Sequence, residues 1–345
     1  MGACAGDQPM MPRLLELLAA DGERLRAAAQ AISGQIEFDA QSLLRRDKAL
    51  DLQPPSDWSP NRHCRLIEAT DGWIAVNLAR EDDVRSVPAW IGYAQNAAPW
   101  DAIIAAAKTQ HCAALLAQAQ LLGMPVAGVR EANPATSHRL NTGHSASRSA
   151  PLRVIDLSAL WAGPLCGGLL AEAGAQVTKI ESIGRADPSQ HATPEHDARL
   201  NGRKQRITLD FSSADNLAQM IEMIAGADVL ITSARPHALA RLGLTPKLLF
   251  AANPCLIWVA ITAYGWHGES AQRVGFGDDC AAAGGLLGWN QGIPRFIGDA
   301  LADPLTGVTS AIAALEALAA GRCGLLDVAL APTAALYAQR AGFVI

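Results

Sequence analysis

A basic surface, paired cysteines and long apolar runs are all missing from this chain of 345 residues. Lys and Arg together number 28 against 33 Asp and Glu, which gives a net charge of −5. Nucleic acids and anionic membranes are bound by basic patches, so neither is expected as a partner. An anionic ligand must instead be held by a few placed cations or by helix N-termini.

The seven cysteines are odd in number, scattered and nowhere in a C-x-x-C pair. This spacing indicates neither a disulfide framework nor a zinc site, and scattered thiols of this kind are usually small buried apolar groups. The eight histidines have no metal-ligand spacing, and His191 and His196 are expected in a polar loop. No metal centre is predicted.

The sequence also lacks a membrane span and a secretion signal. The longest apolar stretch, 311–338, is interrupted by Glu316, Arg322 and Asp327, whereas a span needs about 20 nearly unbroken apolar residues. No basic segment followed by an apolar one stands at the N-terminus. We therefore expect a cytoplasmic protein.

What the chain does have is the material for a large core, since 50% of its residues are hydrophobic and 18% are charged. Its length favours two domains. Residues 133–150 are polar, rich in Ser, Thr and Asn and without apolar periodicity, which is typical of a linker. We predict a small α/β domain over 1–132, which holds two of the eight histidines and is expected to carry little chemistry, and a second domain over 151–345.

The second domain alternates strand and helix patterns. Buried strands are expected at 152–158, 176–181, 206–211, 228–233 and 255–265. Such alternation is typical of a doubly wound, Rossmann-like parallel sheet. In the first domain the pattern predicts helices near 11–32 and over 100–122, with strands near 71–79 and 124–129.

One turn in the second domain resembles a dinucleotide site. Gly163, Gly167 and Gly168 follow the first strand, and Glu181 ends the next one. The spacing is G-x-x-x-G-G and not the G-x-G-x-x-G of dinucleotide-binding folds. The other interpretation is that these small residues let the first helix pack closely on the sheet.

Several blocks of the second domain resemble, in order and spacing, the family III CoA-transferases of the formyl-CoA and carnitine type. The blocks are 153–181, 201–211, 227–244, 253–265, 285–288, 300–307 and 324–330. The segments 71–79 and 121–129 resemble the smaller domain of that family, which normally comes later in the chain. The order of the domains is then rearranged relative to the family.

The resemblance implies transfer of CoA from an acyl-CoA thioester to a carboxylic acid, with one aspartate as the covalent nucleophile. The block ALADPLTG assigns that role to Asp303. A buried carboxylate held in line with a thioester can attack it. An acid just before a proline that starts a helix is also a common helix cap, which is the alternative for Asp303. Pro304 has no N–H and cannot stabilise an oxyanion.

The chain departs from the family in the stretch GFGDDC. Gly277 stands where the family has an acid, and Asp278 and Asp279 follow it, either as supporting acids or in a solvated turn. Phe276 stands where the related 2-methylacyl-CoA racemases carry a histidine base. Racemisation needs two bases around one carbon, so this substitution favours a transferase over a racemase.

The resemblance also implies a CoA site. We expect the loop of Leu160, Trp161, Ala162 and Gly163 to bind the CoA part of the substrate. Leu209 and Arg241 match further CoA-contact positions of the family. Serines at 182, 212 and 233 stand where the family has Arg, Lys and Asn, so charge is expected from Lys204, Arg273 and Arg185 nearby. A hydroxyl cannot replace a fixed cation at a phosphate.

The expected partners are an acyl-CoA donor, a carboxylic acid acceptor and a second subunit, in a homodimer or in a hetero-oligomer with a homologue. CoA thioester is expected as a substrate and no cofactor as a permanent group. Two alternatives stay open: a catalytically silent, CoA-binding subunit that partners an active homologue, and a 2-methylacyl-CoA racemase-like enzyme.

Overall fold

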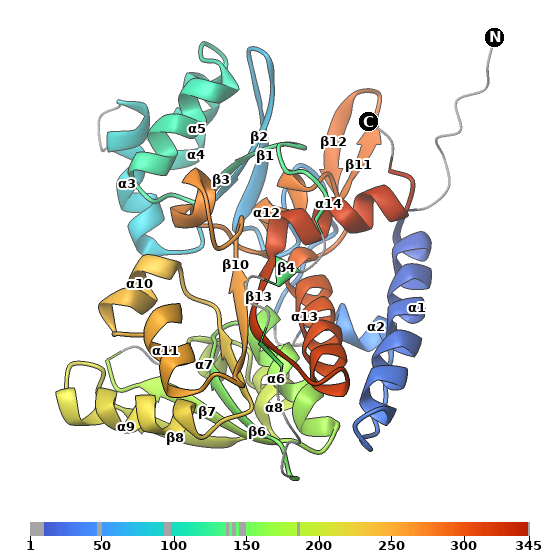
Figure 1. The fold of residues 1–345 in the computed structure, drawn as a ribbon. Coiled ribbons are helices and arrows are strands. Elements are labelled where there is room, and N and C mark those ends of the chain that lie inside the picture. Colours follow the sequence, from blue (N-terminus) through green and yellow to red (C-terminus); the bar gives the residue numbers. More distant parts are fainter. Residues whose placement is uncertain are drawn as a thin grey trace.

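The computed structural model describes residues 10–46, 50–92, 98–135, 138–139, 143–144, 150–184 and 187–343. Its largest sheet has six parallel strands in the order β13-β10-β9-β6-β7-β8 (Figure 1). Their bounds are β6 (Arg153–Leu157), β7 (Gln176–Ser182), β8 (Gln205–Leu209), β9 (Val229–Thr232), β10 (Ile257–Thr262) and β13 (Arg322–Ala329). The chain runs outward from β6 to β8, then returns to β9 and continues to β13. This order confirms the predicted doubly wound, Rossmann-like sheet.

Both faces of this sheet are covered, which is why β9 and β10 are buried along their whole length. In β9, Val229 and Ile231 face one hydrophobic core and Leu230 faces the other. The first core is closed by α6 (Ala162–Glu172), α8 (Pro194–Asn201), α13 (Ala302–Ala319) and α14 (Leu330–Arg340). The second is closed by α9 (Ala214–Ala225), α10 (Pro236–Arg241) and α11 (Pro246–Ala252).

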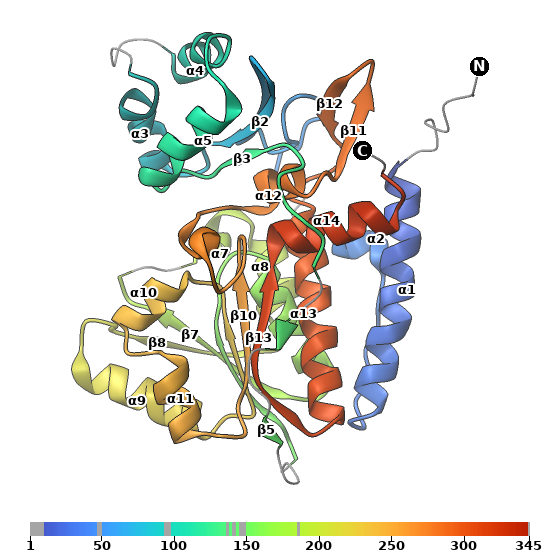
Figure 2. The same cartoon turned by 45° about the horizontal axis from the view of Figure 1, so that its top comes forward.

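A smaller body lies at one end of the large sheet (Figure 2). Its antiparallel sheet has the order β1-β2-β3, with β1 (Cys64–Ala69), β2 (Gly72–Asn77) and β3 (Val126–Gly128). Helices α3 (Glu81–Ile91), α4 (Pro99–Ala107) and α5 (Cys112–Leu121) pack on it around a third core. The single helix predicted over 100–122 is therefore two helices, separated by a turn at Thr109–Gln110.

Several shorter elements complete the fold. They are α2 (Ala40–Leu43), α7 (Ser189–Ala192), the 3-10 helix η1 (Glu269–Gln272), α12 (Gly277–Ala283) and the hairpin β11 (Leu287–Asn290) with β12 (Ile293–Phe296). Short strands β4 (His138–Arg139) and β5 (Gly143–His144) pair antiparallel with β13. Most of the predicted linker 133–150 lies outside the described residues.

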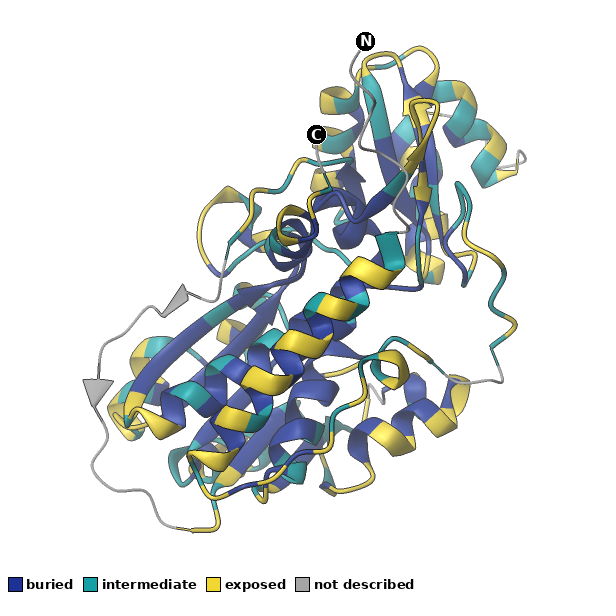
Figure 3. Cartoon of the chain, turned by 90° about the vertical axis from the view of Figure 1, so that its right-hand side faces the viewer, coloured by how far each residue is buried: buried dark blue, intermediate teal, exposed yellow. Residues whose placement is uncertain are grey.

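Segments cross between the two bodies. Helix α1 (Met10–Gln30) packs on α13, and its Leu14, Leu18 and Leu25 are buried in the first core. Its outer side is exposed, as Figure 3 shows. In the other direction, the backbone of α12 accepts hydrogen bonds from Arg130 and Ala132, which follow β3. Contacts thus join the predicted units 1–132 and 151–345, and the division of the chain into these two domains stays a prediction.

Within the described ranges, none of the helices is both long and apolar enough to cross a membrane. The six cysteines in those ranges form no disulfide.

Candidate active site

The loop predicted to cradle CoA follows β6, next to the point where the chain order of the sheet reverses. Leu160 has a φ of 69° and donates its N–H to Asp187 Oδ2 at 3.0 Å. Ala159 donates its N–H to Ser233 Oγ at 2.9 Å, which ties this loop to the end of β9. Ligands of open α/β sheets bind at such a switch point. The loop is therefore well placed for a ligand.

Beneath the loop lies a buried ion pair. Lys204 Nζ donates to Asp156 Oδ2 at 2.7 Å, to the Pro164 carbonyl at 2.7 Å and to Asn201 Oδ1 at 2.8 Å. All three ammonium protons are used, and the side chain is buried. Burial alone would raise the pKa of Asp156, but Lys204 and Lys179 outweigh it and the pKa is lowered. The expectation that Lys204 offers its charge to CoA is thus corrected.

The glycines of the first helix serve packing. A Cβ on Gly167 would lie 2.7 Å from Asp156 Oδ2 and 2.8 Å from Lys204 Nζ. A Cβ on Gly168 would lie 2.7 Å from the Leu200 carbonyl of α8. Contacts below 3.0 Å leave no room for a side chain, so these glycines allow close approach of the helix and need no pyrophosphate to explain them.

Asp303 is the second residue of α13 and is half-buried. The N-cap of this helix is Leu301, and no side chain in the described part of the chain caps it. The helix-cap alternative for Asp303 is therefore wrong. Its carboxylate instead accepts the backbone N–H of Gly277, the first residue of α12. A Cβ at position 277 would lie 2.4 Å from Asp303 Oδ2, so the position holds glycine because the carboxylate fills that space.

The packing of α13 on α6 brings Asp303 toward the loop after β6. Gly307 lies one turn beyond Asp303 on the same face of α13. A Cβ on Gly307 would be 2.8 Å from the Ala162 carbonyl and 3.0 Å from Leu165 Cβ. The two helices therefore touch through backbone near their first turns. Asp303 lies one helical turn before this contact between α13 and the end of the loop.

Two further carboxylates surround the start of α13. Asp278 Oδ1 accepts the N–H of Ala300 at 2.7 Å, and Ala300 has a φ of 46°. Asn61 Nδ2 donates to Asp278 Oδ2 at 2.8 Å and to Asp299 Oδ1 at 2.9 Å. One amide therefore bridges two buried acids. Asp278 lies in the site as expected, and Asp299 joins it.

Arg46 connects this acid cluster to the loop. Its Nη2 donates to Asp299 Oδ1 at 2.6 Å and its Nε donates to Asp299 Oδ2, a bidentate pair. Its guanidinium carbon lies 5.5 Å from the ring centroid of Trp161. Arg46 and Asn61 both belong to the segment 1–132, so this segment supplies side chains to the candidate site, which was not expected from the sequence.

Two carboxyl groups of the site, those of Asp303 and Asp278, have raised pKa values. Burial raises the pKa of Asp303 to about 7, opposed by Arg46 and reinforced by Asp278 and Asp299. Burial also raises the pKa of Asp278 to about 6, with the Asp299 charge adding to it. A carboxylate of raised pKa is a better nucleophile and proton acceptor than a solvated one.

Asp279, the other expected supporting acid, is used structurally. It is fully buried, and its Oδ1 accepts Asn77 Nδ2 at 2.9 Å and the Phe276 N–H at 3.0 Å. This closes the first turn of α12 and joins it to β2. Burial raises the pKa of Asp279 well above its ordinary value.

The remaining predicted CoA contacts are spread over the fold. Leu209 is buried in the second core, and Arg241 is the last residue of α10 and is exposed. Arg273 Nη2 donates to Glu131 Oε1 at 2.5 Å, and its guanidinium lies 3.7 Å from the Tyr264 ring. Arg273 therefore holds η1 to the small body and does not lie open to a phosphate. Arg185 lies outside the described residues.

The sequence did not indicate that His196 lies beside the loop after β6. It is 3% exposed on α8, and its ring lies 4.6 Å from that of Trp161 in an edge-on contact. The polar loop expected around it is two short helices, α7 and α8. Among the described residues no group of three or more metal-ligating side chains comes together.

The family model for CoA-transferase family III matches residues 150–342, more than half of the sequence. The chain belongs to CoA-transferase family III. The matched range contains the large parallel sheet, the loop after β6 and Asp303, which confirms the resemblance read from the sequence.

Curated relatives are about a third identical to this chain over the aligned residues. An acyl-CoA transferase of Fusarium pseudograminearum is 32% identical over 212 residues, which cover 54% of this chain and 46% of the relative. A succinyl-CoA–D-citramalate CoA-transferase of Chloroflexus aurantiacus is 33% identical over 180 residues, 48% of this chain and 44% of the relative. The chain thus spans about half the length of these relatives.

Solved structures of similar proteins also match about half of the chain. A CAIB/BAIF family protein from Brucella suis superposes with a TM-score of 0.50 at 31% identity, covering 54% of this chain and 53% of that one. Rv3272 from Mycobacterium tuberculosis superposes with a TM-score of 0.51 at 29% identity, covering 59% of each chain. The family III fold is therefore shared over the matched half.

Sequence reasoning did not find Arg46, Asn61 or Asp299 in the family III site. Asp299 stands four residues before Asp303, directly before the block 300–307, and that proximity was the available signal. Arg46 has no motif around it, and its contact with Asp299 joins residues 253 apart in the chain.

Proposed function

We propose that this family III protein transfers CoA from an acyl-CoA thioester to a carboxylic acid, with Asp303 as the covalent nucleophile. The observation that carries the proposal is the state of Asp303. Its carboxylate does not cap its own helix, lies against glycine, and has a pKa raised to about 7 by burial. It also lies where α13 meets the loop after β6. These are the features of a reactive carboxylate beside a ligand site.

The chemistry proceeds by exchange at Asp303. The carboxylate attacks the thioester carbonyl, the C–S bond breaks, and a mixed anhydride and CoA thiolate form. The thiolate attacks the aspartyl carbonyl, which releases the first acid and leaves an aspartyl-CoA thioester. The acceptor carboxylate attacks that thioester, giving a second anhydride and thiolate. The thiolate then attacks the acceptor's acyl carbonyl, which forms the new acyl-CoA and frees Asp303. No net proton or electron is needed.

The surrounding residues support these steps. Arg46 favours the ionised form of Asp303, and it lies between Asp299 and Trp161. No described side chain caps the first turn of α6, so N–H groups there are suited to an oxyanion. Gly277 N–H already donates to the nucleophile. Asp278 and Asp299 add negative charge, which raises the proton affinity of Asp303.

The names of the relatives support a class of CoA donor and a class of acceptor but no particular compound. Curated relatives are named for transfer from succinyl-CoA to D-citramalate or L-malate. We therefore propose an acyl-CoA donor and a carboxylic acid acceptor for a cytoplasmic enzyme that binds CoA as substrate, with no permanent cofactor. Of the predicted phosphate-binding cations in the described part of the chain, Arg241 is the exposed one.

The test is a transfer assay. The chain is incubated with a panel of acyl-CoA esters and carboxylic acids, and new acyl-CoA species are detected by liquid chromatography and mass spectrometry. We expect at least one new acyl-CoA with the wild type and none with Asp303→Ala. Gly184→Ala is the control, because a Cβ there meets nothing within 4 Å. Equal transfer by Asp303→Ala would refute the nucleophile.

A second candidate is a catalytically silent subunit that binds CoA beside an active homologue. Two observations favour it: Lys204 and Arg273 are engaged inside the protein, and Gly277 replaces the family acid. Relatives include the alpha and beta subunits of one succinyl-CoA–L-malate CoA-transferase. CoA binding by calorimetry together with no transfer from any ester would select this candidate.

A further inference from the structure

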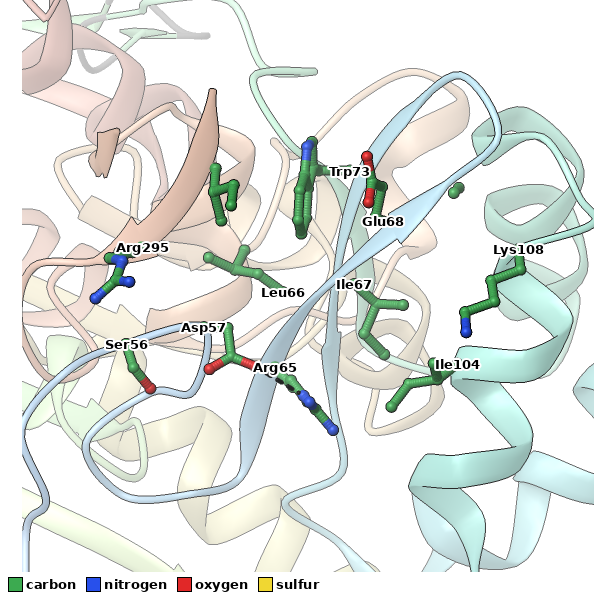
Figure 4. Close-up of a pocket in the computed structure, with 12 residues that line it drawn as sticks. Ser56, Asp57, Arg65, Leu66, Ile67, Glu68, Trp73, Ile104, Lys108 and Arg295 are labelled. Carbon is green, nitrogen blue, oxygen red and sulfur yellow. Dashed lines mark hydrogen bonds and ion pairs between the residues drawn. The ribbon is translucent and has the colours of Figure 1, made fainter. Parts of the chain in front are cut away.

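A separate hollow of about 540 Å³ opens in the smaller body, between β1, α4 and β12 (Figure 4). None of the residues that line it takes part in the candidate active site. Its size lies in the range of small-molecule pockets in proteins. It is therefore a candidate ligand site separate from the candidate active site.

The backbone around the hollow excludes an added β-strand. Strand β1 is at the edge of its sheet, and the outward N–H groups of Leu66 and Thr70 donate to Asp57 O at 2.7 Å and Gln110 O at 3.1 Å. Between them, the N–H of Glu68 points to the same side, since outward groups alternate along an edge strand. In the described ranges nothing accepts it. One open N–H cannot hold a strand.

The opposite wall is closed to strand pairing as well. The N–H of Phe296 in β12 donates to Ser56 O at 2.8 Å. Two residues earlier, Pro294 faces the same edge and has no N–H to offer. Both walls thus favour a small molecule over a peptide.

The interior of the hollow is mainly apolar. Ile67 of β1, Trp73 of β2, Ile104 of α4 and Ile293 of β12 line it. Ile293 is 47% exposed, so its side chain is open to a ligand in the hollow. A hydrocarbon chain lying over these residues would remove apolar surface from water.

Cations stand at two sides of this apolar lining. In Figure 4, Lys108 and Arg295 lie on opposite sides of the hollow. Neither makes an ion pair or a side-chain hydrogen bond to any residue the structure describes. Arg65, in contrast, is paired with Asp57 at 3.0 Å. With Glu68 as the other acid, the lining has three basic and two acidic side chains.

We propose that this hollow binds a linear organic dicarboxylate. Its two carboxylates meet Lys108 and Arg295, and its carbon chain crosses the edge of β1. Ile67 and Ile104 flank this path on the helix-covered face of the small sheet, and Trp73 flanks it on the other face. Two cations separated in this way select an anion that is charged at both ends, because each carboxylate gains a charge-assisted hydrogen bond. A molecule with a single carboxylate gains only one of these two hydrogen bonds.

The experiment is calorimetric titration of the full chain with suberate, a dicarboxylate with an eight-carbon chain. Octanoate, which has one carboxylate, and 1,8-octanediol, which has none, are the matched ligands. We expect suberate to bind at least about tenfold more tightly than octanoate, and octanediol more weakly still. Lys108→Glu and Arg295→Glu should each weaken suberate binding by about tenfold or more.

Two controls make the result decisive. Arg85→Glu makes the same charge change on an exposed helix outside the hollow and should leave the affinity unchanged. Asp303→Ala should also leave it unchanged, which separates this hollow from the active site. Circular dichroism checks that every variant is folded. No suberate binding below about 10 mM, equal binding of octanoate, or unchanged binding in both Glu variants would overturn the proposal.

Discussion

At the residue scale, the proposal depends on the ionisation of Asp303. Only the carboxylate form attacks a thioester, and burial raises the pKa of this group to about 7. We therefore predict that single-turnover release of CoA rises with pH and reaches half its maximum near pH 7. Stopped-flow detection of the free thiol between pH 5 and 9 measures it. A rate that does not change between pH 6 and 8 would contradict the role of this titration.

Arg46 is predicted to set that midpoint. Replacing it with methionine removes the cation that lowers the pKa of Asp303 while keeping much of the side chain's length. The midpoint of the pH–rate profile should move upward by about one unit or more. Arg46→Lys keeps the charge but loses the bidentate geometry, and should move the midpoint less.

The matched control for Arg46 is Arg85→Met. Arg85 is an exposed arginine of α3 that pairs with Glu81 of its own helix. This variant should leave the midpoint where it is. A purely structural role of Arg46 would lower the rate at every pH without moving the midpoint, and that result would refute the electrostatic role.

Single residues were predicted from the sequence where a motif surrounded them. Asp303 was predicted through the block ALADPLTG; the structure places its carboxylate against Gly277 and not at the cap of α13, and its role as nucleophile stays a proposal. Arg46 and Asn61 were missed because no local pattern marks them. Their role comes from contacts with Asp299 and Asp278 that span more than 200 residues of chain.

At the scale of elements, the contact between α12 and α13 holds the site together. Gly277 begins α12, and Asp303 Oδ2 lies where its side chain would be. We predict that Gly277→Ala displaces the carboxylate, lowers transfer by about tenfold or more and destabilises the fold by roughly 1–3 kcal/mol. Transfer rates and thermal melting measure the two effects.

Gly184→Ala is the counterpart, since nothing lies within 4 Å of a Cβ at that position. It should leave both quantities unchanged. If Gly277→Ala transferred CoA at the wild-type rate, glycine at this position would not be required to hold the Asp303 carboxylate in place. That result would refute the prediction.

Elements were predictable from sequence where apolar residues repeat with a clear period. The buried strands β6, β9 and β10 all appear near their expected positions. The boundary between α4 and α5 was not predicted, because both helices continue the same apolar pattern. Strand β1 was missed for a related reason: its sequence CRLIEA alternates only in part, and its pairing with β2 decides its conformation.

At the scale of the whole molecule, the active site is assembled from both predicted units. The large sheet supplies the loop after β6 and Asp303, and the segment before β1 supplies Arg46 and Asn61. Helix α1 adds to this by packing on α13. Composition and spacing predicted the sheet correctly, but docking between distant segments depends on side-chain fit that no local pattern encodes.

The measurement that tests the central claim most directly is hydroxylamine trapping. The chain is incubated with acyl-CoA esters, hydroxylamine is added, and peptides are mapped by mass spectrometry. An aspartyl anhydride or thioester is converted to a hydroxamate at the residue that carried it. We predict a hydroxamate on Asp303 that requires acyl-CoA and disappears in Asp303→Ala. A hydroxamate on another acid such as Asp278, or CoA binding with no adduct for any ester, would contradict catalysis through Asp303.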